Sequence, residues 1–203
     1  AEGVVVALTS EDNKTGVAVY LSCETDFVAK NEEFSKLATA IANAALAAGA
    51  KTTEDVLALS LGATTVKDAI QEKVSAIGEL IDVSAYALLA GESVVAYNHM
   101  GNRIGVLVAL NKPLSEAVTT IGKDVAMQIA AMRPVAVDAA GVPAEILERE
   151  KSIAREKAAA SGKPENILDK IAEGAANTFV KENTLLNQPF VKDGSKTVQQ
   201  VLA

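Results

Sequence analysis

The strongest constraint on the fold is a pattern that occurs twice: two β-branched segments around a short polar stretch, followed by a segment with helical periodicity. Two such β-branched runs in succession are typical of an antiparallel hairpin. Glycines and valines recur at matching places in the two copies, so the chain is predicted to contain two related hairpin-plus-helix modules. The four predicted strands are residues 4–8, 17–22, 94–98 and 104–110.

Apolar residues at helical spacing follow each hairpin. In the first module Asn31 is a good N-cap and Gly49 a good end for one helix. Thr65 can cap another helix before a strand at residues 80–89, and in the second module the helical spacing covers residues 114–129. The sequence therefore predicts an α+β fold of two related subdomains, each with an antiparallel sheet and packed helices.

From Pro143 the sequence becomes charged and strongly helix-forming. The run Ser161-Gly162-Lys163-Pro164 is typical of a helix end and restart, so residues 143–180 are predicted to form an inserted antiparallel helical hairpin, a short coiled coil. Its expected seam is Ile146, Ile153 and Ala160 against Ile167, Ile171 and Phe179. The predicted parts of the chain are residues 1–90, residues 91–142 with 181–203, and the hairpin 143–180.

Charge and hydropathy exclude several functions. The chain has 19 Lys and Arg against 26 Asp and Glu, a net charge of -7, and no basic cluster offsets it, so direct binding to nucleic acid is disfavoured. Its most apolar stretch, residues 80–90, contains Asp82 and is far shorter than the roughly 20 residues of a membrane span. The first residues resemble a strand and carry no basic leader, so we expect a soluble, cytoplasmic protein without membrane contact.

Candidate catalytic and metal-binding residues are few. The single cysteine, Cys23, excludes an internal disulfide and fits a reducing compartment. Carboxylates at Glu24 and Asp26 would raise the pKa of its thiol, so a buried apolar role is favoured over a nucleophile. The single histidine, His99, has no partner at metal-ligand spacing and is expected to be an exposed turn residue. We expect no metal, no cofactor and no chemical active site.

Phe27 is conspicuous because aromatic residues are scarce. The chain has no Trp, three Tyr and four Phe, so its core must consist mainly of aliphatic side chains. Phe34, Phe179 and Phe190 fall at apolar positions of predicted elements, whereas Phe27 stands in a polar, acidic stretch after the second predicted strand. Phe27 is therefore the best candidate for a contact with another molecule.

Five short blocks of the sequence follow one another in order over nearly the whole chain. The first block is residues 25–34, which begins with Thr25-Asp26-Phe27-Val28. The others are Ile77-Gly78-Glu79, residues 97–108, residues 161–164 and residues 188–198. Together these blocks resemble the bacterial elongation factor Ts family. The resemblance implies a core region of such a factor, without the family's N-terminal ubiquitin-associated-like domain and C-terminal end.

This resemblance implies a guanine-nucleotide exchange factor for elongation factor Tu, active in translation elongation. The implied site is Thr25, Asp26, Phe27 and Val28, with supporting contacts from Ile77, Gly78 and His99. Asp26 would make a polar contact and Phe27 would enter an apolar pocket of the GDP-bound partner, which disturbs the magnesium and phosphate site. The second subdomain would engage the third domain of elongation factor Tu.

Other functions stay open as alternatives. The same fold could serve as a binding module or assembly subunit, since members of the family are also recruited by some viral polymerases. The helical hairpin could contact the nucleotide domain of the partner or mediate self-association. An enzyme would require a reactive Cys23.

Overall fold

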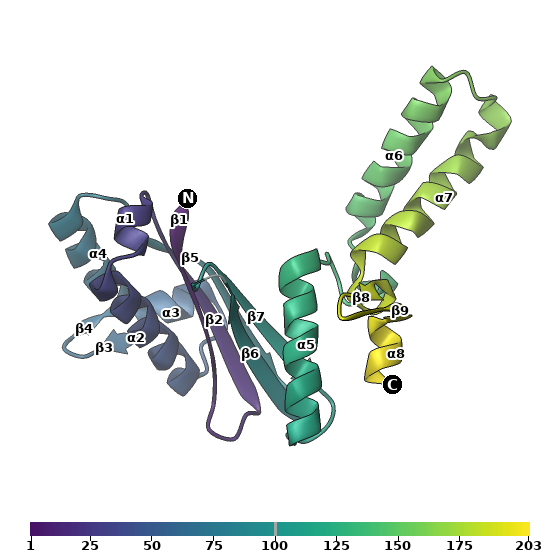
Figure 1. The fold of residues 1–203 in the computed structure, drawn as a ribbon. Helices are drawn as coiled ribbons and strands as arrows, with labels where there is room; N and C mark the ends of the chain where they lie inside the picture. The colour runs from purple at the N-terminus through teal and green to yellow at the C-terminus, as the bar shows by residue number, and fades with distance from the viewer. Residues whose placement is uncertain (100) are drawn as a thin grey trace. The chain divides into compact units, whose positions relative to one another are not determined.

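The structure is a computed structural model that describes residues 1–99 and 101–203 (Figure 1). Internal contacts divide it into a first unit, Ala1–Ala130, and a second unit, Ala131–Ala203. Both units combine helices with small antiparallel sheets, which confirms the predicted α+β class. In the two described ranges, no helix is both long enough and apolar enough to cross a membrane.

A three-stranded antiparallel sheet with the order β1-β2-β5 organises the first unit. Its strands are β1 (Glu2–Thr9), β2 (Thr15–Cys23) and β5 (Asp82–Ala90), close to the predicted segments. The register pairs Glu2 with Cys23 and Ser22 with Asp82. The start of β1, the end of β2 and the start of β5 therefore lie together, at what we call the Cys23 end of the sheet.

Helices between β2 and β5 cover one face of this sheet (Figure 1). The elements are α1 (Asp26–Ala29), α2 (Glu32–Ala48), α3 (Thr53–Ala58), β3 (Ser60–Leu61), β4 (Thr64–Thr65) and α4 (Val66–Ile77). Asn31 caps α2 by accepting from the N–H groups of Glu33 and Phe34, and Gly49 ends that helix in the left-handed region, as predicted. Fully buried side chains such as Phe34 and Ile41 form the core with Val and Leu residues of the sheet.

The second hairpin also belongs to the first unit. It consists of β6 (Ser93–His99) and β7 (Ile104–Leu110), followed by α5 (Glu116–Met132). The Asn98 carboxamide accepts from the N–H of Ala7 and donates to its carbonyl, so it satisfies backbone groups of β1 that no strand pairs. A Cβ atom on Gly122 would lie 2.6 Å from the Val95 side chain, so this glycine lets α5 approach the hairpin closely.

The second unit contains the predicted helical hairpin and a small C-terminal sheet. Its elements are η1 (Ala139–Gly141), α6 (Ala144–Ala160), α7 (Glu165–Asn183), η2 (Leu185–Asn187), β8 (Pro189–Phe190), β9 (Asp193–Thr197) and α8 (Val198–Leu202). Two ion pairs join α6 to α7, one between Lys151 and Glu173 at 2.9 Å and one between Arg155 and Asp169 at 2.8 Å. The finer division into residues 1–90, 91–142 with 181–203, and 143–180 stays a prediction.

The predicted seam between α6 and α7 was wrong at two of its three α6 positions, Ile153 and Ala160, whereas Ile146 is half-buried. Ile153 is 52% exposed and Ala160 is also exposed, whereas Ala158 is buried, together with Ala172 and Ala176 of α7. Ile153 and Ala158 are five positions apart, which separates their side chains by about 140° around the helix axis. The most buried side chains of the hairpin are therefore small alanines, and Ile153 faces solvent, while Ile167 and Ile171 are half-buried.

Candidate functional site

Phe27 lies on the short helix α1 and points into solvent. Its side chain is 83% exposed, more than any other large apolar side chain of the described residues. None of the four residues of α1 is buried, but Val28 and Ala29 pack against the edge of the core. Val28 therefore anchors the turn to the core, while Phe27 stays exposed to solvent, where it can contact another molecule.

Asp26 stands next to Phe27 with its carboxylate partly exposed. Lys30 donates to its Oδ2 atom at 3.0 Å, one helical turn later. This hydrogen bond, supported by the charge of Lys30, holds the pKa of the Asp26 carboxyl below its ordinary value. The site thus presents an ionised carboxylate beside an exposed aromatic ring.

A pair of glutamates connects this turn to the segment after α4. Glu79 Oε1 accepts from the backbone N–H groups of Glu24 at 3.1 Å and Thr25 at 3.0 Å, and Glu79 Oε2 accepts from the Thr25 hydroxyl at 2.7 Å. In return, Glu24 Oε2 accepts from the N–H of Leu80 at 3.2 Å. The hydrogen bond from Thr25 is the main reason that the pKa of Glu79 lies below its ordinary value. We call these four hydrogen bonds the glutamate clamp.

The glutamate clamp joins the segment of Phe27 to a segment with two further exposed apolar side chains. Ile77, the last residue of α4, is 38% exposed, and Leu80 is 73% exposed. Gly78 ends α4 with a φ of 81°, a left-handed conformation that lets the chain turn back toward the sheet. The predicted residues Ile77 and Gly78 are thus joined through their neighbour Glu79 to the segment that carries Phe27.

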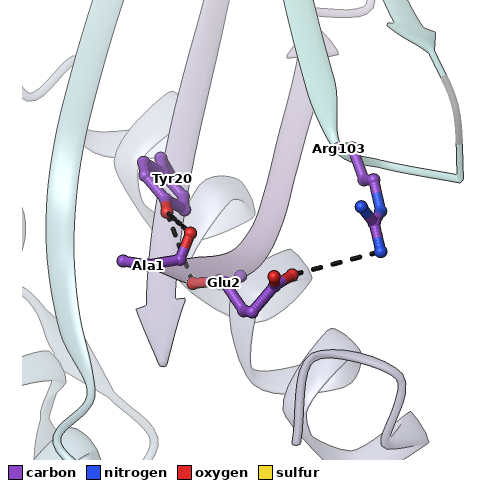
Figure 2. Close-up of a pocket in the computed structure, with 5 residues that line it drawn as sticks. Ala1, Glu2, Tyr20 and Arg103 are labelled. Atoms are coloured by element: carbon purple, nitrogen blue, oxygen red, sulfur yellow. Dashed lines mark hydrogen bonds and ion pairs between the residues drawn. The ribbon is translucent and has the colours of Figure 1, made fainter. Parts of the chain in front are cut away.

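The tip of the second hairpin also reaches the Cys23 end of the sheet. The N–H of Val5 donates to the carbonyl of Asn102 at 2.7 Å, and the Arg103 guanidinium lies 4.0 Å from the Glu2 carboxylate. Glu2 and Arg103 line a small pocket together with Tyr20, whose hydroxyl donates to the carbonyls of Ala1 and Glu2 (Figure 2). This packing places the hairpin tip at the start of β1.

His99 is the last residue of β6, next to that tip. The expectation of an exposed turn residue was wrong, because His99 belongs to a strand, is half-buried, and its Nδ1 atom lies 2.6 Å from the Tyr97 hydroxyl. A hydroxyl that donates to Nδ1 leaves the proton of a neutral ring on Nε2. His99 can then offer an Nε2–H donor at the same end of the sheet as Phe27.

Cys23 does not have the surroundings of a catalytic nucleophile. Its side chain is 3% exposed, and its thiol donates to the carbonyl of Thr25 at 3.2 Å. Burial raises the pKa of the thiol, and the carboxylates of Glu79 and Glu2 raise it further. The predicted direction is confirmed, but the carboxylates responsible are Glu79 and Glu2 and not the expected Glu24 and Asp26. Among the described residues, no group of three or more His, Cys, Asp or Glu side chains could hold a metal ion.

Three residues, Glu24, Glu79 and Leu80, contact or extend the turn of Phe27, and the sequence did not indicate this role for any of them. Glu24 and Glu79 form the clamp although they are 55 positions apart, and Leu80 was assigned only to a strand. The signal that could have found Leu80 is strand alternation: Ile81 and Val83 are buried on the two sides of Asp82, whereas Leu80 comes before the first strand residue and directly after the helix-ending Gly78-Glu79 pair. For Glu79 no local signal points to these partners, because all three donors to its carboxylate lie on Glu24 and Thr25, 55 and 54 positions away in the sequence.

Comparison with known proteins gives the family. Residues 24–203 match the family model described as elongation factor TS. The chain is 49% identical to the elongation factor Ts of Amoebophilus asiaticus over 201 residues, which are 99% of this chain and 73% of that protein. It is 44% identical to the elongation factor Ts of Cytophaga hutchinsonii and 43% identical to that of Porphyromonas gingivalis, over all of this chain and 73% and 72% of those proteins. The chain therefore belongs to the elongation factor Ts family of translation elongation factors.

Proposed function

We propose that this protein is a guanine-nucleotide exchange factor for elongation factor Tu and that it promotes GDP release by disturbing the magnesium and phosphate site of its partner. The observation that carries the proposal is the 83% exposed Phe27 beside the ionised Asp26, on a turn anchored by Val28 and the glutamate clamp. Such a turn presents an apolar wedge and a negative charge together. We propose that the protein acts in the cytoplasm, where translation elongation takes place.

The chemistry of the partner's site explains why this pair would be effective. A magnesium ion that bridges the phosphates and the protein supplies much of the charge stabilisation of a bound nucleotide. Phe27 would enter an apolar pocket of the nucleotide-binding domain and move the elements that hold the ion, while Asp26 competes for polar groups in the same region. Weaker coordination of the ion lets GDP leave faster.

The exchange cycle follows from thermodynamic linkage. If the factor binds nucleotide-free elongation factor Tu more tightly than the GDP-bound form, then nucleotide must weaken binding of the factor by the same ratio. Excess GTP can therefore displace the factor after exchange. No covalent step is involved, so the proposal requires neither an enzymatic active site nor a cofactor on this chain.

Supporting contacts are proposed for residues that share the Cys23 end of the sheet. Ile77, Gly78 and Leu80 would extend the apolar contact around Phe27, and the Nε2–H group of His99 would donate a hydrogen bond. Thr25 caps α1 by accepting from the N–H of Val28, so its role is to shape the turn. We further propose that the second hairpin with α5 binds the third domain of elongation factor Tu.

A GDP-release assay tests the proposal directly. Elongation factor Tu loaded with a fluorescent GDP analogue is mixed with the protein and an excess of unlabelled GDP, and release is followed by stopped-flow fluorescence. We expect the release rate to rise with the concentration of the protein until it saturates. Capture of elongation factor Tu in a pull-down without faster release would instead favour a binding module or assembly subunit.

A further inference from the structure

We propose that Glu79 is a positioning residue for exchange: its carboxylate holds the turn of Asp26 and Phe27 in the orientation that acts on the partner. This inference rests on the proposed exchange function and assigns a role to a residue outside the set expected to touch elongation factor Tu. It is carried by the geometry of the glutamate clamp.

The short helix α1 needs outside support. It has four residues, which is too few for a stable helix by itself, and its N-terminal side-chain cap is a long hydrogen bond, 3.4 Å from the N–H of Val28 to the Thr25 hydroxyl oxygen. Residues before α1 are held instead by Glu79, which accepts from two successive N–H groups and one hydroxyl. One carboxylate thus satisfies three donors at the start of the turn.

The hydroxyl of Thr25 links Glu79 to the N-terminal cap of α1. When Thr25 donates its proton to Glu79 Oε2, the lone pairs of its oxygen are left to accept from the N–H of Val28. Glu79 therefore orients the cap of α1 as well as the backbone before it. Loss of the carboxylate frees the hydroxyl to rotate and removes two backbone partners, so Phe27 loses its fixed direction.

The clamp also couples two exposed apolar groups. Gly78 reverses the chain after α4 and brings Glu79 toward the turn, and the reciprocal bond from the N–H of Leu80 to Glu24 fixes the next residue. Leu80, at 73% exposure, is thereby tied to the same segment as Phe27. A single displacement of the clamp would misplace both side chains.

Substitution of Glu79 tests the inference, with Glu72 as the matched control. Glu72 is an exposed glutamate of α4. We expect Glu79→Ala to lower the maximal GDP-release rate at saturating protein about tenfold, because charge-assisted hydrogen bonds are lost, and Glu72→Ala to leave the rate unchanged. Glu79→Gln can still accept from both N–H groups through its amide oxygen, so its rate should recover to within about threefold of the wild type.

Two further readouts separate positioning from general destabilisation. First, amide hydrogen exchange in the free protein should become faster at Glu24 and Thr25 in Glu79→Ala, while the Phe34 region of α2 keeps its protection. Second, Thr25→Ala and Glu79→Ala should be non-additive, with the double variant little slower than Glu79→Ala alone. Loss of protection throughout the first unit, or fully additive effects, would overturn the positioning role.

The outcomes distinguish this inference from the proposed function. If the wild type accelerates GDP release, Phe27→Ala is slow and Glu79→Ala is as fast as the wild type, the positioning role is overturned and the exchange function stands. If the wild type itself does not accelerate release, the exchange function is overturned together with the role of Glu79 in it.

Discussion

Substitution of Phe27 by alanine tests the central feature of the site. The phenyl ring contacts little of its own protein, because it is 83% exposed on a helix without buried residues. Phe27→Ala should therefore leave the thermal unfolding temperature of the free protein unchanged within about 1 °C. Any loss of exchange then reports on the contact with the partner and not on the fold.

The expected loss of binding free energy in Phe27→Ala follows from the apolar area that the ring can bury against the partner. An aromatic side chain buries about 150 to 250 Å², and apolar burial contributes about 25 cal/mol per Å². Incomplete enclosure and the methyl group that remains in alanine reduce the difference to about 2 to 4 kcal/mol, a range typical of binding hot spots. Affinity for nucleotide-free elongation factor Tu should therefore fall by a factor of about 30 to 1,000.

Stopped-flow release of a fluorescent GDP analogue measures the effect as a function of protein concentration. Leu89→Ala is a suitable control, since Leu89 is 38% exposed and lies on β5 opposite Gly16, at the other end of the sheet. Phe27→Ala should slow release strongly, whereas Leu89→Ala should not. If both variants accelerate release as well as the wild type, the wedge mechanism is refuted.

Four further predictions follow from individual residues. Asp26→Ala should slow GDP release less than Phe27→Ala, and the defect should depend on the magnesium concentration; equal rates at all magnesium concentrations would contradict a role at the ion. Because hydrogen bonds hold the pKa of Glu79 below its ordinary value of 4.5, its contribution to stability is fully present above that pH and is lost as the pH falls through the lowered pKa. In acid denaturation, Glu79→Gln should therefore lose less stability than the wild type as the pH falls below 4.5, and parallel curves would exclude the effect. Iodoacetamide should modify Cys23 slowly at neutral pH in the folded protein and rapidly in urea, because burial raises the pKa of its thiol and blocks access; rapid native labelling would reopen an enzymatic role. Phe34→Ala should cost about 3 to 5 kcal/mol of unfolding free energy in urea titrations, in contrast to Phe27→Ala, since Phe34 is 1% exposed.

Local patterns were sufficient for most elements of the fold. The strands followed from β-branched runs, and the ends of α2 followed from Asn31 and Gly49, because capping depends on groups within a few positions of each other. The exposed position of Phe27 was expected for a similar reason, since its neighbours in sequence are polar. The seam of the helical hairpin was predicted wrongly at Ile153 and Ala160, because buried alanines such as Ala158 allow close packing that hydrophobicity alone does not indicate.

The sequence by itself determined which residues belong to the exposed turn and to which family the motifs point. Only the tertiary structure decided how the turn is held: Glu79 meets Thr25 across 54 positions, and Asn98 pairs with Ala7 across 91. Periodicity indicates the face of an element on which a residue lies, but it contains no information about which distant element covers that face. Those partners are set when the strands pair and the helices close over the sheet, so the clamp that supports Phe27 exists only in the folded protein.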